Sequence, residues 1–194
     1  VQYSQDKPLG DDSMHFSTLD ITKVGLFAAC AVIAAMLLRF AADIVPFSLL
    51  PFVAIFAGTV LGKKLGSVSM FLYILLGLIG LPVFAAPPFG GIAYVLNPTF
   101  GFLLGFVLAA YTAGLILEKF GRTYVNYLVA SIAGILVIYL IGIPYLALIL
   151  HFYMGQAISL NQVLKIGFYP FIPLDLIKAV ISSVLAYRIK RRLP

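Results

Sequence analysis

The stretch from Thr99 to Leu117, TFGFLLGFVLAAYTAGLIL, decides the fold of this chain. It carries no charged residue, and its apolar residues run on continuously. A transmembrane helix needs about 20 mostly apolar residues to cross the hydrocarbon core of a bilayer. A β-barrel strand would instead alternate apolar and polar residues. The stretch therefore predicts a membrane-spanning α-helix.

The composition extends this prediction to the whole chain. Of the 194 residues, 62% are hydrophobic and only 10% are charged, with a mean hydropathy of +1.09. An ordinary soluble domain carries about 25% charged residues, and a soluble globule of this size cannot bury so much apolar surface. The composition excludes a soluble enzyme, a disordered tail and a nucleic-acid-binding protein.

Six apolar stretches predict six transmembrane helices. They lie at residues 23–42, 46–61, 65–84, 99–117, 127–145 and 173–189. The connections are short, so we expect an all-α integral membrane protein, a compact six-helix bundle formed by the single domain 17–194. Residues 1–16 are a polar segment. Met14 could be the natural start of the protein, in which case residues 1–13 would derive from the expression vector. Pro144 should end or kink the fifth helix.

The distribution of basic residues predicts the orientation. Six spans place three basic residues on one side, Arg39, Lys165 and Lys178. The other ten fall on the opposite side: Lys7, Lys23, Lys63, Lys64, Lys119, Arg122, Arg188, Lys190, Arg191 and Arg192. Because cytoplasmic loops carry the excess of Lys and Arg, we expect both termini to be cytoplasmic.

The segment 81–98 is an unusual connection on the outer side. It has four prolines, two glycines, Gly90 and Gly91, and no charge. Non-helical backbone at membrane depth is tolerated where it is buried in protein or lines a cavity. We therefore expect the segment to roof a pocket, with a solvated apolar loop as the alternative. Residues 160–166 predict a short interfacial helix.

Asp175 and Lys178 are the first candidates for chemistry. Pro173 suits the first turn of the last helix, where the helix dipole favours a carboxylate such as Asp175. Lys178 follows three residues later on the same face, and an ionisable residue within a membrane span is a functional candidate. Either the two form a structural ion pair, or Lys178 meets a ligand carboxylate while Asp175 accepts hydrogen bonds from ligand N–H groups.

Asn97 precedes Pro98, so it is either a helix cap or a ligand contact that can both donate and accept hydrogen bonds. Arg39 and Asp43 have the i, i+4 spacing of an ion pair. The lone Cys30 and the isolated His151 predict no metal site. No phosphate-binding loop or hydrolase motif is present, so the chain is expected to bind a molecule rather than transform it.

Ala31 and Ala35 form a small-xxx-small pair in the first span. Such a pair lets a second helix approach closely. It predicts either a partner interface, if the alanines face outward, or ordinary packing inside the bundle.

Two blocks of sequence resemble the BioY family, the biotin-specific substrate-binding components of energy-coupling-factor transporters in prokaryotic cell membranes. The first block has LPVF at 81–84, GG at 90–91 and NPTFGFLLGF at 97–106; the second is PFIPLDLIKA at 170–179. The chain departs from the family pattern at 85–88, where AAPP replaces a Gly-rich run.

The resemblance implies a multi-pass biotin-binding protein without a cofactor. Lys178 would meet the valerate carboxylate of biotin, and Asn97 and Asp175 would hold its ureido group. Gly90 and Gly91 would let the loop approach the ligand, and aromatic residues such as Tyr94 would line an apolar trough. The first helix, with Ala31 and Ala35, would dock on a transmembrane coupling subunit driven by two cytoplasmic ATPase subunits.

Three alternatives remain open from the sequence. The chain could bind a different vitamin in the same architecture. It could be a proton-coupled carrier with Asp175 as the titrating group, although the internal repeat typical of such carriers is not evident. It could also be a membrane scaffold or assembly subunit in which Asp175 and Lys178 form a plain ion pair.

Overall fold

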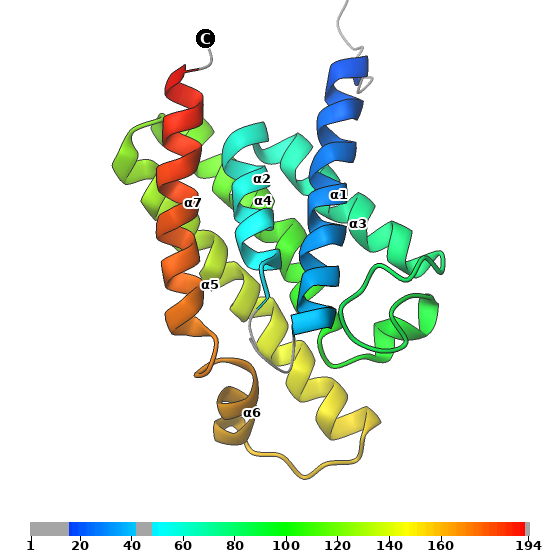
Figure 1. The fold of residues 1–194 in the computed structure, drawn as a ribbon. Coiled ribbons are helices and arrows are strands. Elements are labelled where there is room, and N and C mark those ends of the chain that lie inside the picture. Colours follow the sequence, from blue (N-terminus) through cyan, green and yellow to red (C-terminus); the bar gives the residue numbers. More distant parts are fainter. Residues whose placement is uncertain (1–15, 42–47, 193–194) are drawn as a thin grey trace, which may run out of the picture.

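The computed structural model of the chain describes residues 16–41 and 48–192. Its described residues form seven α-helices, one 3₁₀ turn and one π turn (Figure 1). These are α1 (Thr18–Ala41), α2 (Leu50–Leu61), α3 (Lys63–Leu78), η1 (Ile92–Leu96), α4 (Phe100–Phe120), α5 (Tyr124–Leu148), η2 (Ile149–Tyr153), α6 (Leu160–Gly167) and α7 (Ile172–Arg192). The predicted all-helical bundle is confirmed, and α6 is the predicted short helix at 160–166.

The six predicted spans correspond to α1–α5 and α7, but their lengths differ. Among the described residues, α1, α4 and α5 with η2 are each long and apolar enough to cross a membrane, and α6 with α7 make a fourth candidate bent by 48°. The helices α2 and α3 have only 12 and 16 residues. Gly62, with φ of 88°, separates them, so two predicted spans become a tight pair of short helices.

Glycines bring α2, α3 and α4 together. A Cβ atom on Gly58 of α2 would lie 2.1 Å from the carbonyl oxygen of Ala110 in α4. A Cβ atom on Gly114 of α4 would lie 2.2 Å from the backbone nitrogen of Lys63. These backbones are therefore in direct contact, as small residues allow in membrane bundles.

This contact predicts a difference between two glycine substitutions. We expect Gly58→Ala to lower the free energy of unfolding by about 1–3 kcal/mol, because overpacking forces backbone apart. Gly25→Ala in α1 is the matched control, since nothing lies within 4 Å of its added Cβ. Thermal unfolding of the purified protein in detergent measures both, and equal midpoints for the two variants would contradict the α2–α4 contact.

The predicted end of the fifth helix at Pro144 is wrong, and the alternative of a kink there stays a prediction. α5 continues through Pro144 to Leu148 and passes into η2. Pro144 lies on the exposed face of α5, so its ring points away from the bundle core. Proline is tolerated within transmembrane helices when neighbouring groups satisfy the freed carbonyl.

Ala31 and Ala35 face the interior of the bundle. Both side chains are fully buried in the main core cluster, which is the internal packing that the sequence left open. The outward face required for a partner interface belongs to other residues of α1, including Gly25, Leu26, Ile33 and Leu37. An interface through Ala31 and Ala35 therefore does not fit this conformation.

The antiparallel helices α5 and α7 form the frame of the candidate site. Near one end the rings of Tyr127 and Tyr187 lie 5.9 Å apart, and further along the pair Tyr139 bonds to Asp175. Figure 1 shows the start of α1 and the end of α7 at one end of the bundle, with α6 at the opposite end. Asp175 and Lys178 lie in the half of α7 nearer to α6.

Candidate functional site

Asp175 and Lys178 form a buried ion pair that joins three parts of the fold. Lys178 Nζ lies 2.7 Å from Asp175 Oδ1 and donates a second hydrogen bond of 2.7 Å to the carbonyl oxygen of Ser48, just before α2. The hydroxyl of Tyr139 in α5 donates to Asp175 Oδ2 at 2.5 Å. Asp175 and Lys178 are only 4% and 7% exposed. The cluster thus links α7, α5 and the start of α2.

The start of α7 places these groups as the sequence predicts. The helix begins at Ile172, and Pro173 occupies its first turn, where the absent backbone donor costs nothing. Asp175 lies in the same turn, so the positive end of the helix dipole favours its ionised form. Lys178 follows one turn later and reaches back to the carboxylate.

Sequence reasoning missed Tyr139. Its ring is held edge-on by Phe102 at 6.2 Å and by Phe168 at 4.8 Å between centroids. The sequence carries no signal for it, because the residues around it are apolar on every face of this helix; the structure shows that Ile135, Tyr139 and Gly142 share the buried face of α5. A buried tyrosine usually finds a partner for its hydroxyl, and here that partner is the carboxylate of Asp175.

The hydrogen-bonding capacity of Asp175 is not exhausted. An ionised carboxylate offers about four lone-pair sites, and the described contacts occupy one on each oxygen, from Lys178 and from Tyr139. A buried charge is costly unless it is paired and hydrogen-bonded. The site is therefore an electrostatically balanced donor and acceptor pair that can still accept hydrogen bonds from a ligand.

Arg39 anchors the loop that follows α3. Its guanidinium donates to the carbonyl oxygens of Pro82 and Phe84 at 2.7 and 2.6 Å and lies 4.1 Å from the centroid of the Phe89 ring. Asp43, its predicted ion-pair partner, lies outside the described residues. The contacts that the structure gives Arg39 bind the end of α1 to the loop.

The predicted roof segment packs aromatic side chains into the bundle. The ring of Phe84 is fully buried, 4.2 Å from Tyr94 and 5.7 Å from Tyr73 between centroids. A Cβ atom on Gly77 of α3 would fall 2.0 Å from the Phe84 ring. Tyr94 is itself 2% exposed. The loop thus inserts Phe84 and Tyr94 into the core, while its residues Leu81, Ile92 and Leu96 stay exposed.

The side chain of Asn97 joins two parts of this loop by hydrogen bonds. Its side-chain amide donates to the carbonyl oxygen of Pro87 at 3.1 Å, and its Oδ1 accepts from the backbone nitrogen and the hydroxyl of Thr99 at 2.9 and 2.7 Å. The hydroxyl of Thr99 also lies 3.2 Å from that of Tyr94. Asn97 therefore fixes the turn before α4, but α4 begins at Phe100 with Thr99 as its N-cap and no side-chain cap hydrogen bond, so the predicted cap by Asn97, with Pro98 in the first helical position, is wrong.

Gly90 and Gly91 allow the loop to fold back on α3. A Cβ atom on Gly90 would lie 2.3 Å from the carbonyl oxygen of Leu81. Gly91 has φ of 92° and donates its backbone N–H to the carbonyl oxygen of Gly77 at 2.7 Å. Their close approaches in this structure are to the protein itself, and the predicted approach to a ligand stays a prediction.

The site residues fall into two groups. Asp175 and Lys178 form one, bonded to Tyr139 and Ser48, while Asn97, Tyr94, Gly90 and Gly91 form the other, within the loop between α3 and α4. The start of α4 connects the groups, because Phe100 contacts Tyr94 and Phe102 contacts Tyr139. Within the described part of the chain, no cluster of His, Cys, Asp or Glu could hold a metal ion.

The arrangement matches a known class of membrane protein. The fold is similar to the crystal structure, at 2.1 Å, of the S-component for biotin from an ECF-type ABC transporter, with a TM-score of 0.74 over 92% of this chain and 96% of that chain. The sequences are 23% identical, so this likeness defines the fold. The class is therefore an all-helical membrane protein with the S-component fold.

The chain belongs to the BioY family, whose model matches residues 8–194. It is 37% identical to a biotin transporter BioY of Thermotoga maritima, over 88% of this chain and 95% of that protein. It is 39% identical to a probable biotin transporter BioY of Pyrococcus horikoshii, over 88% of this chain and 96% of that protein. The family predicted from the two sequence blocks is confirmed.

Proposed function

We propose that this chain is the biotin-binding subunit of an energy-coupling-factor transporter. It binds biotin on the outer side of a prokaryotic cytoplasmic membrane and delivers it inward with a coupling subunit and two ATPase subunits. Both termini then lie in the cytoplasm. The observation that carries the proposal is the buried, balanced pair of Asp175 and Lys178 in a BioY-family chain.

The geometry of the pair suits the ureido group of biotin. This group presents a carbonyl oxygen beside two N–H donors, and the pair presents a donor, Lys178 Nζ, 2.7 Å from an acceptor, Asp175 Oδ1. Adjacent groups of opposite kind on both sides form complementary hydrogen bonds. We therefore assign Lys178 to the ureido oxygen and Asp175 to a ureido N–H.

This assignment differs from the role that the family resemblance implied for Lys178. The carboxylate and the ureido group lie at opposite ends of biotin, separated by a bicyclic ring and an alkyl chain. A donor and an acceptor in direct contact cannot each meet a different end of the ligand unless they first separate. Since Asp175 is buried, their separation would take from its carboxylate the cation that is 2.7 Å away in this structure.

The loop between α3 and α4 supplies the apolar part of the proposed pocket. Vitamin-sized ligands are mostly enclosed by apolar and aromatic side chains with a few polar groups that fix orientation. The aromatic ring of Tyr94, the glycines Gly90 and Gly91, and the amide of Asn97 lie in this loop. If the hydrogen bonds of Asn97 to Pro87 and Thr99 break, its side-chain amide becomes available to the ligand.

The chain itself has no sequence of the form GxxxxGK[ST] for binding nucleotide phosphates. Energy for delivery must then come from other subunits, which supports the proposed coupling subunit and ATPases.

The direct test is the ligand that the purified protein carries. Mass spectrometry of the denatured protein should detect released biotin, and titration in detergent should show saturable one-to-one binding. Release of a different vitamin would keep the site and change the ligand. Binding of no small molecule would overturn the proposal and favour the scaffold alternative.

Asn97→Ala should weaken biotin and biotin amide to the same extent, by roughly 5- to 100-fold, because the amide hydrogen bonds of Asn97 serve the ureido end and hold the loop. Titration of both ligands by calorimetry measures the effect. Thr99→Val is the matched control, since it removes a hydroxyl bonded to Asn97 and leaves the contact of Asn97 with Pro87. If Thr99→Val weakens binding as much as Asn97→Ala, Asn97 acts through the loop alone.

A further inference from the structure

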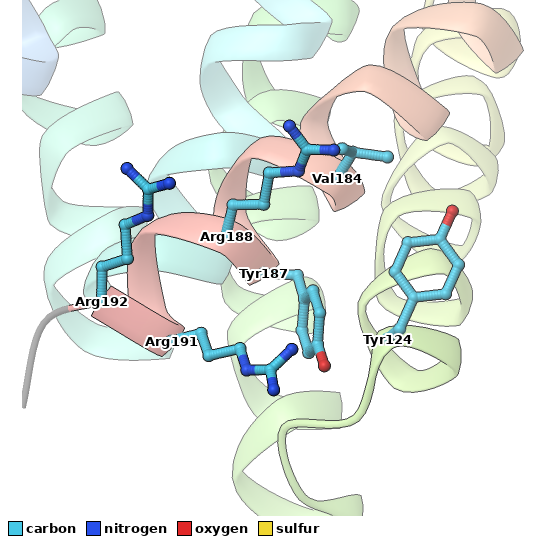
Figure 2. Close-up of a pocket in the computed structure, with 6 residues that line it drawn as sticks. All are labelled: Tyr124, Val184, Tyr187, Arg188, Arg191 and Arg192. Carbon is cyan, nitrogen blue, oxygen red and sulfur yellow. The ribbon is translucent and has the colours of Figure 1, made fainter.

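Two adjoining cavities lie where α5 begins and α7 ends. The larger, of about 510 Å³, is lined by Tyr124, Val184, Tyr187, Arg188, Arg191 and Arg192 (Figure 2). The smaller, of about 200 Å³, is lined by Arg122, Tyr127, Tyr187, Lys190 and Arg191. They share Tyr187 and Arg191, and together we call them the basic cavity. It lies at the opposite end of α7 from Asp175.

The basic cavity concentrates positive charge without a matching carboxylate. Five of its lining residues are cationic and none is acidic. In the described part of the chain, the ion pairs are Lys178 with Asp175 and Lys63 with Glu118 at 2.9 Å, and neither includes a residue of the cavity. The pKa of Glu118 is lowered chiefly by its hydrogen bond to Lys63 and also by the charge of the cavity residue Arg122, but Glu118 itself does not line the cavity.

A buried hydroxyl in the same place also lacks a partner. The side chain of Tyr127 is fully buried, and its hydroxyl makes no hydrogen bond within the described residues, although it lines the smaller cavity. Most buried polar atoms are satisfied, and an exception calls for an unseen partner. An anionic oxygen in the cavity would accept from this hydroxyl and from the neighbouring cations. Phosphate oxygens bind in this way to arginine groups.

Apolar surface continues from the cavity along the bundle. On α7, Val184 lines the cavity, and Val180 and Ile177, which follow at helical spacing, are exposed. On α5, Ile132 lies two turns beyond the cavity residue Tyr124 and is also exposed. Figure 2 shows Tyr124 of α5 facing the α7 residues Val184 and Tyr187 across this region. A ligand with a phosphate head and an acyl chain fits both parts, whereas a free phosphate fits only the first.

We propose that the basic cavity binds the phosphate headgroup of an anionic phospholipid, with an acyl chain lying along Val184, Val180 and Ile177. Basic pockets between transmembrane helices are known to hold anionic lipid heads on the cytoplasmic side. The bound lipid would join the start of α5 to the end of α7.

Native mass spectrometry tests the proposal on the whole protein. The protein is released from micelles that contain equal amounts of phosphatidylglycerol and phosphatidylcholine, and the lipid that stays bound is identified by its mass. We expect one phosphatidylglycerol to be retained. Arg188→Gln with Arg191→Gln should weaken its retention by roughly 25-fold, since each basic residue contributes to anionic-lipid binding. Tyr127→Phe should weaken it by about two- to tenfold.

Lys64→Gln with Lys119→Gln is the matched control. Both lysines are exposed and outside the cavity, so the variant loses the same charge and should retain the lipid. Equal loss in the two double variants would mean diffuse attraction and overturn the site. Competition by millimolar inorganic phosphate alone, or no preference for phosphatidylglycerol in the unmodified protein, would also overturn it. Unchanged biotin binding in the Arg188 and Arg191 variant separates this outcome from failure of the proposed function.

Discussion

Lys178→Met is expected to weaken binding of biotin and of biotin amide by the same factor. The change removes the ammonium and keeps an unbranched side chain of similar length. Truncating one partner of a buried hydrogen-bonded charge pair costs about 2–5 kcal/mol, which corresponds to roughly a 30- to 4,000-fold rise in the dissociation constant. The dissociation constants of both ligands should rise by the same factor, because the proposed contact is with the ureido oxygen, which both ligands have. Isothermal titration of both ligands measures it.

Two comparisons make this result decisive. Lys165→Met in α6 is the control, because Lys165 is exposed and should leave both affinities unchanged. A loss confined to free biotin would place the ligand carboxylate at Lys178, as the family resemblance implies. In that case the 2.7 Å contact between Lys178 and Asp175 would have to break on binding, and our assignment of the ureido group would be wrong.

The helices could be predicted from the sequence, but their inner and outer faces could not. In a soluble helix the apolar face marks the core, whereas here the surrounding lipid is apolar too. In α1, the buried Ala31 and Ala35 and the exposed Ile33 and Leu37 are all apolar. Composition therefore does not tell which face of α1 is buried, and the sequence left open whether the two alanines face a partner or the bundle interior.

The part of the candidate site that lies within one helix could be predicted from the sequence, whereas the part that depends on helix packing could not. Asp175 and Lys178 are three residues apart on one helix, so their contact follows from helix geometry alone. Ser48 and Tyr139 lie 130 and 36 residues away from their partners in the sequence, and only the packing of α2, α5 and α7 brings them in. Similarly, Arg39 donates to backbone carbonyl oxygens of the loop. Every residue has such an oxygen, so the residue types in the sequence do not predict which ones Arg39 binds.

The largest structural effect should come from Asp175→Leu, and it should be reversible by a second change. Removing the carboxylate breaks the buried 2.7 Å ion pair with Lys178, which costs about 3–5 kcal/mol of stability. Replacing both groups, as Asp175→Leu with Lys178→Met, removes the buried charge and should restore the stability lost through it, while the loss of acceptor and donor for the Tyr139 hydroxyl and the Ser48 carbonyl leaves a cost of about 1–3 kcal/mol. Thermal unfolding without ligand measures all three proteins.

Biotin binding should not return with stability in the double variant. An apolar pair can fill the same space between α5 and α7, yet it offers neither a donor for the ureido oxygen nor an acceptor for its N–H groups. Titration of the double variant should therefore detect no binding at concentrations that saturate the unmodified protein. Recovery of both stability and affinity would show that the pair only joins helices, because a ligand contact cannot be replaced by packing. Recovery of stability alone separates the two roles of Asp175 and Lys178, which are to balance each other in the empty site and to bind the ligand.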